Sequence, residues 1–312
     1  MQNNIELFYA KFSAILHLLW GVKDPMVVAR IGKGYLNYKQ SIDLKLSQYV
    51  DNKLEINFPE TLLCAFQTHS IFYSYCYGLF KIIPAAMLIQ GYRVAVLMSE
   101  SFKYRQINYF QTLSEKYEHV GLKPDILFLS HKSENLLLKM KSLINLGYKI
   151  LIFVDGNKGA IENSTKNMYA TKFKQANVLF HQGFAWLNYL LNVNVIHGLV
   201  ITCIEEKISI THWSDTVDST LQKQTYISTV MAAIVQHLDT LIQLDNVHQW
   251  DSLLSLYKWK QSQIKSEICR PISKEFYTSF CLEGNEYYLL EYDTFKVYPT
   301  DRKTYLNLKL VI

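Results

Sequence analysis

The chain has 312 residues, 49% of them apolar and 19% charged, so it can bury one large core or two modest ones and is not expected to be disordered. Its formal net charge is +5, and its basic residues are scattered among Tyr and Phe residues. This pattern argues against the clustered basic stripe of a nucleic-acid-binding protein. The five cysteines are widely spaced and form no CxxC pair, which argues against a disulfide framework or a zinc site and for a reducing compartment.

The N-terminal region, residues 3–50, is predicted to be helical, with a break at Gly32 and Gly34. Its apolar segment 12–22 is interrupted by His17 and is too short to span a bilayer. We expect this segment to be a core-facing helix, although it could also lie on a membrane surface. The first residues show no cleavable signal peptide.

The middle of the chain alternates between predicted strands and helices. We expect strands at 61–66, 93–98, 125–129, 149–154 and 177–180, helices at 72–87, 102–118, 131–147 and 182–191, and a strand or hairpin over 195–213. This alternation predicts an α/β fold with a mostly parallel central sheet flanked by helices. Residues 216–267 are predicted to be helical and residues 272–312 to form a small antiparallel addition. We therefore divide the chain into an α/β domain, 1–268, and a β-rich extension, 269–312.

Polar groups follow three of the predicted strands. His69 follows the first, Asp155 opens a polar turn after the fourth, and His181 precedes a helix that begins near Gly183. Because the carboxyl ends of parallel strands meet at one edge, we expect His69 and Asp155 to share an edge of the sheet. Each also has a purely structural interpretation, as a helix-cap neighbour, a tight turn or a capped helix start.

Four stretches, taken in order, resemble the lysophospholipid acyltransferase superfamily, in particular the late acyltransferases of lipid A biosynthesis. They are residues 61–69, residues 85–96 (AAMLIQGYRVAV), residues 150–159 (ILIFVDGNKG) and the tryptophan-bearing segment 246–259. The resemblance implies transfer of an acyl group from acyl-carrier protein or coenzyme A to a hydroxyl or amine. It assigns His69 as the general base, with no covalent enzyme intermediate. It implies no metal and no cofactor beyond the phosphopantetheine of the donor.

The chain departs from the family's motif at position 74. The family has Asp or Glu five positions after its histidine, whereas this chain has Ser74. A hydroxyl can hold an imidazole by one hydrogen bond but cannot neutralise an imidazolium. Three explanations follow: Ser74 suffices for a reactive acceptor, another carboxylate such as Asp155 or Glu100 substitutes, or catalysis has been lost.

The resemblance also implies a substrate-binding set and an acyl channel lined by the aromatic segment 72–80. The expected substrate-binding residues are Tyr73, Asp155, Gly156, Asn157, Lys158, Gly159, His181 and Gly183. Lys103 and Arg105 could face an acidic carrier protein, while Cys64 and Cys76 are expected in the core.

The expected partners are the acyl donor, a lipid, amine or peptide acceptor, and at most a peripheral contact with the inner membrane from the cytoplasm. Two other functions compete: a non-catalytic protein that binds acyl groups or their carrier, and a thioester hydrolase. A carboxylate within hydrogen-bond reach of the His69 ring would favour catalysis.

Overall fold

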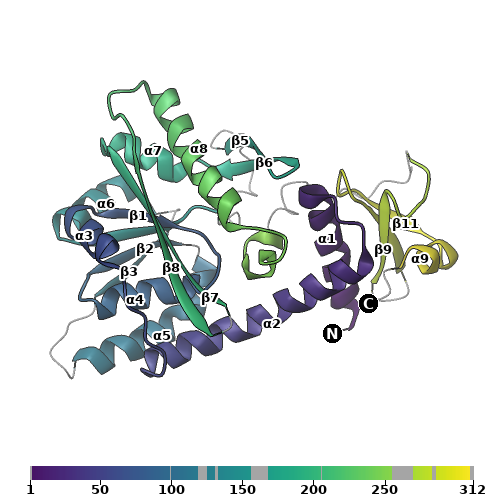
Figure 1. Ribbon diagram of the computed structural model, residues 1–312, viewed down its shortest axis with the longest axis horizontal. Helices are drawn as coiled ribbons and strands as arrows, with labels where there is room; N and C mark the ends of the chain where they lie inside the picture. Colours follow the sequence, from purple (N-terminus) through teal and green to yellow (C-terminus); the bar gives the residue numbers. More distant parts are fainter. Residues whose placement is uncertain are drawn as a thin grey trace. The chain divides into compact units, whose positions relative to one another are not determined.

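The computed structural model describes residues 2–98, 100–118, 125–130, 133–155, 168–204, 206–254, 270–282 and 286–309 (Figure 1). The chain forms two compact units. Unit 1 comprises residues 1–38, 170–179 and 241–312, and unit 2 comprises residues 39–169 and 180–240. The N-terminal helix α1 (Gln2–Trp20) therefore belongs to the same unit as the C-terminal segment. The boundaries of these units differ from the sequence-based division into residues 1–268 and 269–312.

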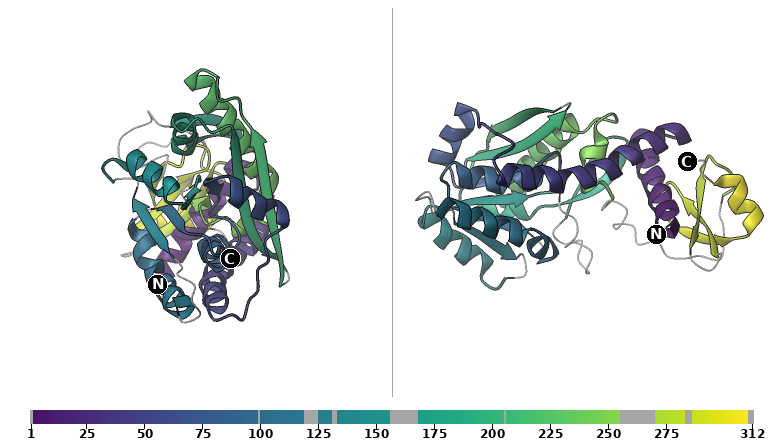
Figure 2. Two further views of the ribbon diagram at one scale, coloured as in Figure 1. Left: turned by 90° about the vertical axis from the view of Figure 1, so that its left-hand side faces the viewer. Right: turned by 90° about the horizontal axis from the view of Figure 1, so that it is seen from below.

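Unit 2 is built on a six-stranded sheet in the order β3-β2-β4-β1-β7-β8. Its strands are β1 (Ile71–Ser74), β2 (Val94–Met98), β3 (Ile126–Ser130), β4 (Lys149–Phe153), β7 (Val195–Ile204) and β8 (Lys207–Thr216). All neighbouring pairs are parallel except β7 and β8, which form an antiparallel hairpin at one edge (Figure 2). The predicted α/β class, with its mostly parallel sheet, is confirmed.

Helices cover both faces of this sheet. They are α3 (Glu60–Thr68), η1 (Phe80–Ile82), α4 (Ile83–Ile89), α5 (Glu100–Glu118), α6 (Leu136–Asn145), α7 (Gly183–Leu190) and α8 (Lys223–Leu241). Figure 1 shows α7 and α8 on one side and α4 and α5 on the other. Because successive strand residues point to opposite faces, Phe72 packs on Phe66 of α3, whereas Tyr73 packs on Phe184 of α7 and His237 of α8.

The segment around His69 differs from the sequence prediction, because residues 61–66 lie in helix α3 and not in a strand. The buried residues Leu62, Ala65 and Phe66 are spaced three and four apart, which is the helical period, and Glu60 lies in the first turn. The predicted helix 72–87 is also wrong at its start, since β1 occupies residues 71–74 with every side chain buried. A short apolar run of this kind cannot be assigned to helix or strand by periodicity alone.

Three other predictions need correction. Helix α2 (Pro25–Val50) continues through Gly32 and Gly34, and the break falls before it, at residues 21–24. A predicted polar loop contains β5 (Met168–Phe173), which pairs with β6 (Ala176–His181) in a separate two-stranded sheet. The C-terminal extension ends in helix α9 (Arg302–Leu308), whose N-cap Asp301 accepts a hydrogen bond from the Thr304 amide at 2.8 Å.

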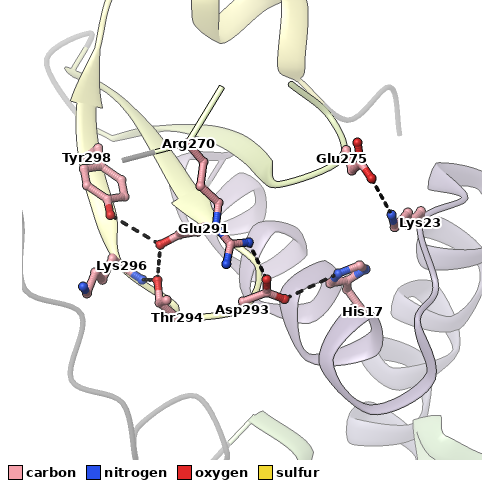
Figure 3. Close-up of polar contacts among 9 residues, drawn as sticks. All are labelled: His17, Lys23, Arg270, Glu275, Glu291, Asp293, Thr294, Lys296 and Tyr298. Carbon is pink, nitrogen blue, oxygen red and sulfur yellow. Dashed lines mark hydrogen bonds and ion pairs between the residues drawn. The ribbon is translucent and has the colours of Figure 1, made fainter. Parts of the chain in front are cut away.

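Unit 1 joins helix α1 to the C-terminal antiparallel sheet. The sheet comprises β9 (Tyr277–Leu282), β10 (Glu286–Glu291) and β11 (Val297–Thr300), and η4 (Val247–Gln249) also belongs to this unit. Figure 3 shows its charged network: Arg270 binds Asp293 at 2.6 Å, and Tyr298 donates to the buried Glu291 at 3.3 Å. Asp293 also lies 3.8 Å from the ring of His17 on α1. The predicted antiparallel addition is confirmed.

The helices in the described ranges are short or polar relative to a membrane span. None of them, taken singly, has both the length and the apolar character needed to cross a bilayer, and only the bent pair Ile5–Trp20 and Pro25–Val50 would meet both criteria together.

Candidate functional site

The candidate residues His69 and Asp155 lie near opposite ends of the neighbouring strands β1 and β4. In the register with β4, Ile71 lies opposite Ile150 and Ser74 lies opposite Phe153, so corresponding ends of the two strands are adjacent. His69 precedes β1 and therefore lies at the amino edge of the sheet, whereas Asp155 follows β4 at the carboxyl edge. The predicted shared site of His69 and Asp155 is thus wrong, because the element before His69 is a helix.

The His69 ring is oriented by its neighbour Thr68. The Thr68 hydroxyl donates to the carbonyl of Cys64 at 3.0 Å, and its oxygen lies 2.8 Å from Nδ1 of His69. With the Thr68 hydroxyl donating to Cys64, the tautomer that also satisfies the His69 contact has Nδ1–H donating to Thr68 and the lone pair on Nε2. The Lys149 ammonium donates to the His69 carbonyl at 2.9 Å, which fixes this segment to the start of β4.

Ser74 cannot assist His69. It is fully buried at the far end of β1, and its hydroxyl donates to the carbonyl of Tyr75 at 3.4 Å. Within the described ranges, no carboxylate forms a hydrogen bond or ion pair with the His69 ring, whose polar partner is Thr68. The side chain of Glu100, the other proposed substitute, lies outside the described residues. The prediction of a His69–Ser74 dyad is wrong because β1 separates the two side chains.

The carboxyl edge brings together the ends of β1 and β4. Asp155 is only 1% exposed, and its Oδ1 accepts a hydrogen bond from the backbone N–H of Cys76 at 2.8 Å. The chain then turns at Gly78, with φ +57, and the Leu79 amide donates to the carbonyl of Ile201 in β7 at 2.6 Å. A buried carboxylate therefore holds the turn after β1 at the edge where α/β folds usually bind ligands.

Cys76 is the residue that sequence reasoning missed. We expected it in the core of a helix, but it lies in the turn after β1 and is half-buried. Cys76 lies two residues beyond the end of β1, and this position would have marked it had residues 71–74 been recognised as a strand. Cys64, also predicted in the core, is exposed on α3 because it lies on the helix face opposite Leu62 and Phe66.

The predicted acyl channel is part of the core. Each of Phe72, Tyr73, Tyr75, Tyr77, Leu79 and Phe80 is at most 3% exposed. The Tyr73 hydroxyl lies 2.6 Å from Nδ1 of His237, whose Nε2 is 3.5 Å from Asp215, and Tyr75 donates to the carbonyl of Ile234 at 2.5 Å. Burial raises the pKa of Tyr73 above its ordinary value, and the charge of Asp215 adds to this. These hydroxyls are satisfied inside the protein, as buried polar groups usually are.

The remaining predicted site residues either border helix α7 or lie outside the described residues. His181 ends β6 and Gly183 begins α7, and β6 pairs with β5 and not with the main sheet. Gly156, Asn157, Lys158 and Gly159 lie outside the described residues, as do the side chains of Lys103 and Arg105. Within the part of the chain that the structure describes, no group of three or more His, Cys, Asp or Glu side chains is arranged to hold a metal ion.

The chain matches no protein-family model, and no curated protein matches it.

Proposed function

We propose that the protein transfers acyl groups from a thioester donor, and that it does so at the carboxyl edge of the parallel sheet. The order of the four stretches that resemble the acyltransferases supports the chemistry. A single observation supports the place: the 2.8 Å hydrogen bond between the Cys76 amide and the buried Asp155, which joins the ends of β1 and β4. Ligands of open α/β sheets bind at this edge.

We assign the acyl group to Cys76. Its thiolate attacks the carbonyl carbon of the donor thioester, the donor's sulfur leaves and takes up the proton lost by Cys76, and the acyl group remains on Cys76 as a new thioester. An acceptor hydroxyl or amine then attacks this thioester, and its proton returns to the Cys76 sulfur. One thioester replaces another in the first step, so no external energy source is needed.

Asp155 serves as the positioning residue of this site. A nearby carboxylate disfavours a thiolate, so Asp155 does not activate the sulfur by its charge. Its hydrogen bond instead fixes the backbone of the turn, and with it the direction in which the Cys76 side chain leaves the chain. A fixed nucleophile lowers the entropic part of the barrier.

A second candidate places the reaction at the amino edge, with His69 as general base. The observation that favours it is the hydrogen bond to Thr68, which leaves the lone pair of His69 on Nε2. In this arrangement the acceptor attacks the donor directly, and no acyl group is bound to Cys76. Lipid, amine and peptide acceptors remain the proposed substrates, and acyl-carrier protein or coenzyme A the proposed carriers.

An acyl adduct on Cys76 distinguishes the carboxyl-edge reaction from direct transfer at His69. The purified protein is incubated with octanoyl-coenzyme A, thiol release is followed with a chromogenic thiol reagent, and the adduct is located by mass spectrometry of intact protein and peptides. We expect an octanoyl adduct on Cys76 that is absent in Cys76→Ser and retained in His69→Gln. Cys64→Ser is the matched control, because among the cysteines of the described ranges Cys64 is the exposed one and so the most open to non-specific acylation.

Each other outcome rejects this assignment. Thiol release that depends on His69 and not on Cys76 would place the reaction at the amino edge. Release in the absence of any acceptor, with no change in Cys76→Ser, would indicate a hydrolase. Binding of octanoyl-coenzyme A without adduct or release would show a protein that binds the donor and does not react with it.

A further inference from the structure

Three histidine rings from three elements meet near the start of β1, apart from the carboxyl-edge site. His69 caps the end of α3, His197 lies in β7 and His212 lies in β8. The rings of His69 and His197 have centroids 4.2 Å apart, and Nδ1 of His197 lies 3.3 Å from Nε2 of His212. This histidine cluster therefore links the end of α3 to the β7–β8 hairpin.

The central ring is buried without a full set of partners. His197 is 4% exposed, and its Nε2 has no hydrogen-bond partner within the described residues. Phe72 of β1 packs beside it, with ring centroids 5.6 Å apart, and Ser214 lies opposite it in β8. A buried nitrogen that lacks a partner is costly, and a proton on it would be costlier because the charge would also be buried.

The surrounding charges do not stabilise a proton on the cluster. On β8 the neighbouring carboxylate, Asp215, points to the opposite face of the sheet, where it pairs with His237 of α8. At the start of β4 the charged group near the cluster is the Lys149 ammonium, which is also positive and donates to the backbone carbonyl of His69. The cluster is therefore stable while its rings are neutral.

We propose that this histidine cluster is an acid-sensitive latch between α3 and the β7–β8 hairpin. It holds the end of α3 on β7 while the rings are neutral, and it opens when protons on neighbouring rings repel one another. The latch goes beyond the acylation of Cys76 and does not depend on it, because its residues lie at the other edge of the sheet.

Burial and the adjacent rings both lower the pKa of His197. Burial and the neighbouring charges of His69 and His212 lower the pKa of His197 to about 4, and burial lowers the pKa of His212. In an open state the rings are hydrated and bind protons near the ordinary value of about 6.5. The open state therefore binds more protons, and falling pH favours it.

The test is a hydrogen–deuterium exchange pulse at fixed pH after equilibration between pH 7.5 and 4.5. In the wild-type protein, peptides from residues 60–72 and 195–216 should lose protection before those from β2 and β4. His212→Gln removes one charge from the half-exposed rim of the cluster, and the opening midpoint should then move to lower pH by about half a unit or more. Exchange at the C2 hydrogen of each histidine ring, read by mass spectrometry, gives the separate titrations.

The matched control is His248→Gln. Burial lowers the pKa of His248 as it does in the cluster, but this residue lies in η4 of unit 1. We expect it to leave the opening unchanged. If His197→Gln fails to fold, judged by circular dichroism at pH 7.5, then His69→Gln and His212→Gln carry the test. Loss of protection in all peptides at one pH, or an opening midpoint unchanged in both rim variants, would overturn the latch.

Discussion

Gly78 closes the turn that carries Cys76, and its replacement by alanine gives the sharpest stability test of the carboxyl edge. Its φ is +57, and an added Cβ would meet the carbonyl oxygen of Ile201 and lie 3.0 Å from Thr202 Cγ2 and 3.2 Å from Thr202 Cα. The left-handed conformation costs an alanine about 1–2 kcal/mol. Relief of the overlap with a backbone oxygen should add about 1–3 kcal/mol. Gly78→Ala should therefore lower the free energy of unfolding by about 2–5 kcal/mol.

Gly91→Ala is the matched control for this prediction. Gly91 has φ +83, but an added Cβ there would meet nothing within 4 Å, so only the conformational cost of about 1–2 kcal/mol applies. Urea unfolding followed by circular dichroism measures both variants, and the midpoints should shift without a change in slope. Equal losses for the two variants would refute the close approach of the turn to β7. Where Gly78→Ala folds, acylation of Cys76 should be slower than in Gly91→Ala.

Three further predictions concern buried polar groups. Asp155→Ala removes the acceptor of the Cys76 amide and should cost about 1.5–3 kcal/mol in urea unfolding, against less than about 1 kcal/mol for the exposed Asp218→Ala; equal costs would contradict the tie between β1 and β4. The pKa of His197 is about 4 in the folded protein and about 6.5 in the unfolded chain. This difference contributes about 3 kcal/mol to the free energy of unfolding above pH 6.5, and the contribution is lost as the pH falls toward 4. His197→Gln should flatten this acid slope in equilibrium unfolding, and an unchanged slope would contradict it. In the C-terminal sheet, Glu291→Gln removes the charge that binds Arg270 and Tyr298, and should lower the thermal midpoint by an amount equivalent to about 1–2 kcal/mol; an unchanged midpoint would show that the charge contributes nothing.

The sequence by itself determined the class of fold and most of its elements. The uninterrupted apolar run of β4 and the runs of β2 and β3 were predicted within a residue or two, because each is a short apolar run set between helical segments and bounded by turn residues. The alternation of these runs with helical segments was enough to predict a mostly parallel sheet. Aromatic alternation likewise predicted the antiparallel strands β9 to β11.

Only the tertiary structure decided which edge of the sheet each candidate residue occupies. A four-residue strand such as β1, with every side chain buried, has no periodicity of its own, so residues 61–66 were taken for the strand and His69 for its end. In the structure the predicted strand is helix α3, and the start of the predicted helix is strand β1. His69 therefore lies at the amino edge, apart from Ser74 and Asp155, and Cys76 lies at the carboxyl edge. The histidine cluster depends in the same way on long-range register: His69 is far in the chain from the hairpin that carries His197 and His212, and the pairing of β1 with β7 brings its ring to theirs. Side-chain spacing along a chain carries no information about such pairing, since it is determined by which strands share hydrogen bonds.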